Sequence, residues 1–159
     1  MESVLQKRSF LEALLRLTRA GNLFIIAFAQ YFTAGCLIGL HTLKDFNLFL
    51  VVSSTVMIAA AGYIINDYYD VKIDYINKPE RVVIGKTITR RYAILFHIIL
   101  SAAGILIGTI VSLKIGAVNV LSVFLLWLYS NSLKRIAFVG NFTVALLTGL
   151  SILLVDFLY

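Results

Sequence analysis

The sequence predicts an all-α fold, a polytopic transmembrane helical bundle with five spans, on three observations. Of the 159 residues, 60% are hydrophobic and only 14% are charged, and the mean hydropathy is +0.94. Soluble domains carry about 45–50% apolar and about 25% charged residues. The uncharged stretches are also regularly long, and the basic residues gather in alternate loops. We therefore expect a single membrane domain over residues 1–159.

Five uncharged runs give the expected spans. They lie at residues 20–40, 46–66, 92–113, 115–133 and 136–155. A hydrocarbon core of about 30 Å requires roughly 20 helical residues, so each run is long enough to cross a bilayer. Small residues within the runs let neighbouring helices approach closely, which favours a bundle over separate anchors.

The basic residues predict the orientation of these spans. All but Lys44 and Lys114 of the 14 Lys and Arg residues precede the first run or lie in the second or fourth loop. Cytoplasmic loops carry an excess of Lys and Arg, so the N-terminus and the Asp-rich loop 67–91 are expected to be cytoplasmic. The net charge of +6 then reflects topology and gives no reason to infer nucleic-acid binding.

The segments outside the runs have their own signals. Residues 1–19 mix leucines with charged residues and predict an amphipathic helix on the membrane surface. Pro79 ends any helix that continues from the second run, and Thr89 is placed to cap the third span.

An acidic cluster closes the second run. If the helix continues, Asp67, Asp70 and Asp74 share one face, with Asn66 beside Asp70 at the i, i+4 spacing. Carboxylates are costly in a bilayer, so they must be solvated, paired or bound to a cation. Hard oxygen ligands suit Mg²⁺, which prefers one or two carboxylates together with substrate phosphate oxygens. These four residues are the predicted metal ligands.

Basic residues on the same membrane side predict a diphosphate site. Mg²⁺ can bridge the acidic cluster to a diphosphate, and Lys and Arg side chains can neutralise the remaining phosphate charge. The candidates are Lys72, Lys78, Arg81, Lys134 and Arg135. Three other interpretations stay open: a solvated charged loop, phosphatidyl transfer from a nucleotide-activated lipid, and a non-catalytic membrane subunit or cation-transport fragment.

Two segments resemble a known family. The pattern Asn66-Asp67-x-x-Asp70-x-x-x-Asp74, followed by Asn77-Lys78-Pro79-x-Arg81, resembles the first aspartate-rich motif of the UbiA superfamily of intramembrane prenyltransferases. The segment Tyr129-Ser130-x-x-Leu133-Lys134-Arg135, followed by Gly140-Asn141, resembles the family's connection between spans four and five. Both patterns occur in the family's order, and the resemblance extends over essentially the whole chain.

The resemblance implies a nine-span bundle that transfers a prenyl group from an isoprenyl diphosphate to an aromatic or other lipid-precursor acceptor. Mg²⁺ would be the cofactor, with Asp67, Asp70 and Asp74 as catalytic residues. By motif position, Asn66 and these aspartates would hold the metal, while the basic candidates and Tyr129 would contact substrate. Tyr68, Tyr69 and Tyr129 are placed to shield an allylic cation, and Arg19 and Asn22 to contact diphosphate.

One part of the family pattern has no counterpart. The second aspartate-rich motif, expected after a sixth span, is absent from residues 1–159. We therefore expect this chain to hold half of a catalytic site, to be inactive alone and to require a missing C-terminal half of the same protein.

Overall fold

The computed structural model describes residues 2–77 and 79–159. Over these residues the chain is mostly helical, and turns of π or 3₁₀ helix lie in three of the connections between its α-helices. The helices are α1 (Glu2–Leu17), α2 (Ala20–Thr33), α3 (Phe46–Asn77), α4 (Arg90–Val111), α5 (Leu113–Asn131) and α6 (Val139–Asp156). The shorter turns are Ala34–Ile38, Leu40–Lys44, Pro79–Arg81 and Leu133–Arg135.

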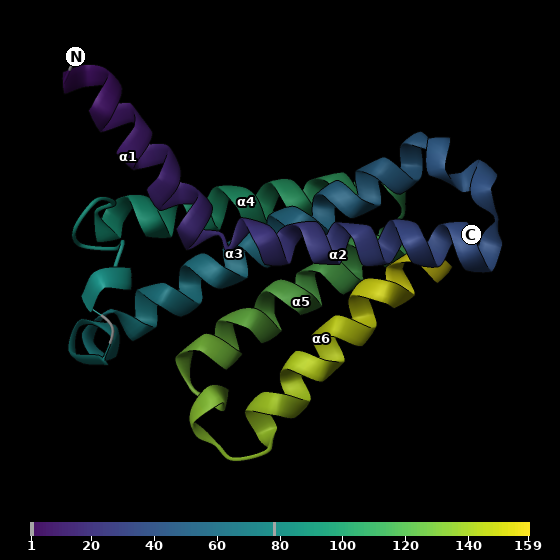
Figure 1. Ribbon diagram of the computed structural model, residues 1–159. Coiled ribbons are helices and arrows are strands. Elements are labelled where there is room, and N and C mark those ends of the chain that lie inside the picture. The colour runs from purple at the N-terminus through teal and green to yellow at the C-terminus, as the bar shows by residue number, and fades with distance from the viewer. Residues whose placement is uncertain (1, 78) are drawn as a thin grey trace.

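Five helical segments in the described part of the chain are long and apolar enough to cross a membrane. They are Ala20–Ile38, Phe46–Asn77, Arg90–Val111, Leu113–Asn131 and Val139–Asp156. The prediction of an all-α bundle with five apolar spans is confirmed, and most observed ends lie within three residues of the expected ones. The protein is therefore an integral membrane protein, with α1 projecting obliquely from the bundle (Figure 1).

α3 is the central helix, in contact with α2, α4, α5 and α6 (Figure 1). It contributes more buried residues than the other helices described. α4 can approach α3 closely because Gly104 has no side chain: an added Cβ would lie 2.7 Å from Ile58 Cγ1 and 2.9 Å from the Ser54 carbonyl oxygen. Such small-residue contacts are how membrane helices gain packing energy without a hydrophobic driving force.

The second span extends further than its apolar run. Residues 67–77, predicted as the start of a loop, are the last three turns of α3. No glycine or proline occurs between Gly62 and Pro79, so nothing in the backbone ends the helix before Asn77. The helical continuation that places the aspartates on one face is therefore present.

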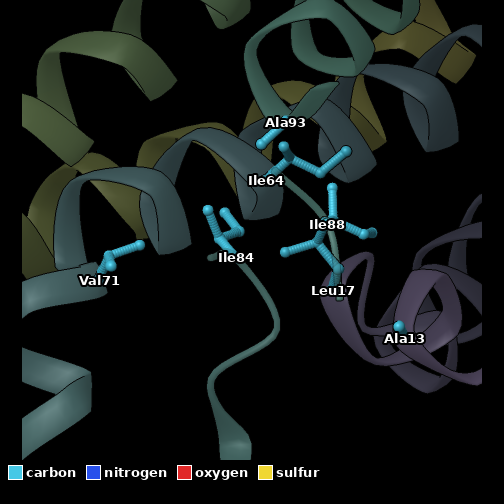
Figure 2. Packing of buried hydrophobic residues seen from close by; sticks show 7 residues of the cluster. All are labelled: Ala13, Leu17, Ile64, Val71, Ile84, Ile88 and Ala93. Carbon is cyan, nitrogen blue, oxygen red and sulfur yellow. The ribbon is translucent and has the colours of Figure 1, made fainter. Parts of the chain in front are cut away.

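The loop after α3 packs back onto the bundle. Ile84 and Ile88 are 1% and 2% exposed and join Leu17, Ile64 and Ala93 in one core cluster. Figure 2 shows the loop residues meeting Leu17 of α1 and Ile64 of α3. The loop ends at α4, where Thr89 Oγ1 accepts a hydrogen bond from the Tyr92 backbone N–H, as predicted for a cap. This packing ties α1, the loop and α4 together beside the acidic cluster.

Candidate functional site

The acidic end of α3 carries a small polar network. Asn66 and Asp70 are neighbours one helical turn apart, and Asn66 Nδ2 donates to Asp70 Oδ2 over 3.2 Å. This hydrogen bond fixes the direction of both side chains. It leaves Asn66 Oδ1 and Asp70 Oδ1 free to bind a further donor.

Lys134 supplies that donor from a distant part of the chain. Its Nζ lies 2.6 Å from Asp70 Oδ1 and 3.2 Å from Asn66 Oδ1. The Lys134 and Asp70 side chains are 14% and 22% exposed, so the pair is shielded from much of the solvent. The turn Leu133–Arg135 between α5 and α6 therefore closes against α3, joining the two segments that carry the sequence patterns.

A second ion pair at this end joins Arg19 to Asp67. Arg19 Nη2 lies 3.1 Å from Asp67 Oδ1, and the guanidinium carbon lies 4.8 Å from the centre of the Tyr63 ring. Arg19 joins α1 to α2 with φ 52° and ψ 54°, a left-handed conformation that is strained for a residue with a Cβ. The bend lets Arg19 reach back over α3.

Two members of this network, Arg19 and Asn66, line one end of a cavity of about 390 Å³ between α2, α3, α5 and α6. Its polar end contains Arg19, Asn22, Asn66, Tyr63 and Tyr129. Further along, the wall is largely apolar, with residues such as Ile26, Ile58, Leu126, Val144 and Leu147. A charged mouth and an apolar wall suit a ligand with an anionic head and a hydrocarbon body.

The oxygen ligands can be tested for their fit to a metal ion. Within the described residues, no three carboxylate, histidine or cysteine side chains come together as a metal-binding group. The three aspartates thus do not form a closed cage around one ion. Asp67 and Asp70 do not line the cavity themselves, but they are bonded to Arg19 and Asn66, which do. Their carboxylates and the Asn66 amide oxygen are hard ligands of the kind that suits Mg²⁺ shared with phosphate oxygens. Mg²⁺ itself remains a prediction.

The other predicted site residues are distributed unevenly. Asp74 lies on the same helix as Asp67 and Asp70 and is partly buried, whereas Lys72 and Arg135 are exposed. Lys78 lies outside the described residues. The backbone of Arg81 falls in the turn Pro79–Arg81, and its side chain lies outside the described part.

The tyrosines predicted at the site lie in different surroundings. Tyr129, predicted to contact substrate, lines the cavity, whereas Tyr68 and Tyr69 are not among its lining residues. The Tyr68 ring instead makes a cation–π contact with Arg90, whose guanidinium carbon lies 4.7 Å from the ring centre. It also packs against the core cluster around Ile84. Tyr63 is a second ring at the mouth beside Tyr129, and it could not be singled out from the sequence because it lies within an uncharged run. Its i, i+4 spacing from Asp67 was the available signal.

Comparison with known proteins gives a consistent family. A model of the UbiA prenyltransferase family matches residues 23–158. The chain is 44% identical over 102 residues to a digeranylgeranylglyceryl phosphate synthase of Sulfolobus acidocaldarius, covering 64% of this chain and 36% of that protein. With the synthase of Methanococcoides burtonii it shares 34% identity over 144 residues, covering 85% of this chain and 50% of that protein.

A solved structure reported for digeranylgeranylglyceryl phosphate synthase in membranes has the same fold. It superposes with a TM-score of 0.81 at 26% sequence identity, covering 94% of this chain and 53% of that chain. The chain thus spans about half the length, or less, of these relatives.

Proposed function

Since the chain belongs to the UbiA prenyltransferase family, we propose that it carries the first aspartate-rich part of a prenyl-transfer site. The donor is an isoprenyl diphosphate, with its diphosphate at the charged mouth and its hydrocarbon chain along the apolar wall. The observation that carries the proposal is the convergence of Asp70 and Lys134 on Asn66, which lines the mouth. Arg19, which also lines the mouth, pairs there with Asp67.

The acceptor we propose is a glyceryl phosphate lipid. The relatives described above are named digeranylgeranylglyceryl phosphate synthases, and this favours a hydroxyl of a glyceryl phosphate over the aromatic acceptors that the sequence left open. The acceptor hydroxyl oxygen attacks the first carbon of the prenyl group. The bond from that carbon to the diphosphate oxygen breaks, the diphosphate leaves with the electron pair, and the hydroxyl proton is released.

The polar residues have different roles in this proposed step. Asn66, Asp67 and Asp70 would hold Mg²⁺ through their oxygens, with Asp74 as a further predicted ligand. When bound, Mg²⁺ would neutralise the diphosphate and stabilise the negative charge that develops as it leaves. Lys134 and Arg19 would move from the carboxylates to phosphate oxygens, since Arg19 lines the mouth and Lys134 is bonded to Asn66 there. Tyr63 and Tyr129 would face the allylic cation.

A second acidic set completes this proposed site. The family resemblance implies it, and the chain's coverage of about half of its relatives supports a source outside residues 1–159. Residues 1–159 alone are then expected to bind the prenyl diphosphate without turning it over.

The test is a transfer assay in membranes that contain the full product of the gene that encodes residues 1–159. Geranylgeranyl diphosphate is supplied with Mg²⁺ and either geranylgeranylglyceryl phosphate or an aromatic hydroxybenzoate. Product is expected with the glyceryl phosphate alone. Asp70→Asn should lower kcat/KM by about 10²–10³-fold, the range for losing one stabilising group of this kind.

Asp45→Asn is the matched control, because Asp45 precedes the other end of α3. It should leave the transfer rate unchanged. Equal rates for Asp70→Asn and the parent would remove the site assignment. Ion flux across vesicles without consumption of prenyl diphosphate would support the transport alternative instead.

A further inference from the structure

The end of the cavity opposite the charged mouth is also lined by polar side chains. Thr55 lies eleven residues before Asn66 on α3, which places it about 16 Å further along the helix axis. Thr55, Asn119, Ser122 and Ser151 line this deep part of the cavity, and we refer to them as the cavity floor. Between the floor and the mouth the wall is mostly apolar. Ser, Thr and Asn side chains in membrane helices normally hydrogen-bond to neighbouring helices, so a group here that is left without a partner requires an explanation.

The hydrogen bonds of the floor leave acceptors unused. Asn119 is 1% exposed, and its Nδ2 donates to Ser54 Oγ over 3.3 Å and to the Gly104 carbonyl oxygen over 3.1 Å. Both amide hydrogens are thereby committed. Among the described residues, no hydrogen bond reaches Asn119 Oδ1 or the hydroxyl of Ser122.

A second buried amide behaves in the same way next to the floor. Gln30 is fully buried, and its Nε2 donates to Thr55 Oγ1 over 3.1 Å and to the Ser151 carbonyl oxygen over 2.6 Å. Its Oε1 is buried with no hydrogen-bond partner in the described part of the chain. Two amide oxygens at or beside the floor therefore lack a donor, although buried polar groups are normally satisfied.

The chemistry of the missing partner follows from these unused groups. A hydrocarbon chain donates no hydrogen bond, and the floor has no carboxylate for a cation. An anion would need several free donors, but the N–H groups of Asn119 and Gln30 are already used. The hydroxyls of Thr55 and Ser151 already donate to backbone carbonyl oxygens, which leaves the Ser122 hydroxyl as the one uncommitted donor of the floor among the described residues. A neutral hydroxyl can donate to an amide oxygen and can also pair with the hydroxyl of Ser122.

We propose that the cavity floor is a binding site for a neutral hydroxyl group, provided by ordered water or by the far end of a hydroxylated lipid. The site would lie about 16 Å from the diphosphate mouth, across the apolar wall. An unmodified prenyl chain then stops short of the floor or leaves it hydrated. The choice of prenyl diphosphates as probes rests on the proposed function. The proposed hydroxyl site rests only on the residues of the cavity floor.

The first experiment measures the affinity of the gene product for prenyl diphosphates with and without a hydroxyl at the far end. The series runs over geranyl, farnesyl and geranylgeranyl diphosphate. One neutral hydrogen bond corresponds to about a two- to tenfold change in affinity. A preference for the hydroxylated probe of this size should appear only in the longer members, because the geranyl chain is too short to reach from mouth to floor.

Variants locate the effect. Ser122→Ala should reduce the preference, and Ser122→Ala combined with Asn119→Leu should abolish it. Ser53→Ala is the control, since Ser53 does not line the cavity. Asn119→Leu also removes bonds to Ser54 and Gly104, so helicity and melting temperature are measured alongside, and Ser122→Ala decides the result if the double variant fails to fold.

A second experiment tests the floor without prenyl diphosphates, so that its result does not depend on the proposed function. It also distinguishes a bound lipid hydroxyl from ordered water. Dodecanol and dodecane differ by one hydroxyl, and a dodecanol preference that Ser122→Ala lowers would support the site even if no prenyl diphosphate bound. If neither hydroxylated probe is preferred, a high-resolution density map of the unliganded protein decides. Water density within hydrogen-bonding distance of Asn119 Oδ1 would assign the site to water, and its absence would overturn the proposal.

Discussion

Lys134 Nζ lies 2.6 Å from Asp70 Oδ1, although 64 residues separate the two along the chain. The same ammonium group lies 3.2 Å from Asn66 Oδ1. The cation thus occupies oxygens that the proposed metal would use. Both side chains are largely shielded from solvent. Removing only one partner of such an ion pair destabilises the protein, because the remaining charge is left unpaired.

This pairing makes opposite predictions for metal and substrate. Lys134→Met should strengthen Mg²⁺ binding in the absence of substrate by about tenfold, because the competing cation is gone. It should weaken prenyl diphosphate binding by a similar factor, because a charge-assisted contact is lost. Calorimetric titration of the gene product with each ligand measures both.

Lys114→Met is the control, because Lys114 lies at the start of α5, far along that helix from the turn that carries Lys134. It should change neither affinity. Parallel losses of both affinities in Lys134→Met would contradict the competition between Lys134 and Mg²⁺.

The left-handed backbone at Arg19 predicts an unusual order of stabilities. Glycine adopts this conformation without the cost of about 1–2 kcal/mol that a Cβ imposes. Arg19→Gly should therefore be more stable than Arg19→Ala by about 1 kcal/mol, the reverse of the order within a helix. Unfolding by SDS in detergent micelles compares the two.

Both Arg19 variants lose the ion pair with Asp67 and the contact with Tyr63. Prenyl diphosphate binding should fall equally in the two, by about tenfold, if the guanidinium contacts phosphate. A higher stability of the alanine variant would show that the backbone at Arg19 relaxes to another conformation.

The close contact of α3 with α4 predicts that Gly104→Ala destabilises the bundle. The new methyl group would meet Ile58 and the Ser54 carbonyl oxygen at less than 3 Å, and the backbone atom cannot move aside cheaply. Overpacking of this kind costs about 1–3 kcal/mol. Gly149→Ala in α6 is the matched control, because no atom lies within 4 Å of the place that its methyl group would take. It should be neutral or stabilise by up to about 1 kcal/mol, and an equal loss in both variants would refute the packing argument.

The contact between Tyr159 and Asp45 predicts a dependence of stability on alkaline pH. Tyr159 Oη donates to Asp45 Oδ2 over 2.8 Å, linking the segment after α6 to the residue before α3. Desolvation and the neighbouring Asp45 carboxylate raise the pKa of Tyr159 from 10.0 to about 12. The neutral phenol is therefore favoured in the folded protein. Its contribution to stability is complete below the unfolded pKa and is lost as pH rises through about 12.

The difference between the tyrosinate absorbance of the parent and of Tyr159→Phe isolates this group from the other tyrosines. Its midpoint should lie near 12 in the folded chain. As the pH rises from the unfolded pKa of Tyr159 to its folded pKa, the free energy of unfolding should fall less in the variant than in the parent. A midpoint near the ordinary tyrosine value of 10.0 would show that the contact with Asp45 does not form.

Much of the fold could be predicted because the membrane imposes it on local sequence. Uncharged runs of sufficient length can only be helices in a bilayer, and Pro79 and Thr89 mark boundaries by their own backbone chemistry. The end of α3 was less visible, because charged residues stop an apolar run without stopping a helix. Residues 67–77 are helical for that reason, and hydropathy alone did not show it.

The candidate site divides in the same way. The polar residues from Asn66 to Asp74 and the basic turn at Lys134 were apparent from residue type and spacing. Their contacts were not, since Arg19 pairs with Asp67 across 48 positions. Tyr63 and Asn119, which also line the cavity, lie within uncharged runs that do not indicate the direction of their side chains.

The sequence by itself determined that the chain is helical, that five segments suit a bilayer, and which polar residues lie near one end. These properties depend on the solvation of single residues and on periodicity along one helix. Only the tertiary structure decided which cation meets which carboxylate, and which small polar side chains turn into the cavity. Those pairings depend on the packing of helices that are far apart in the chain, and no local pattern records that packing.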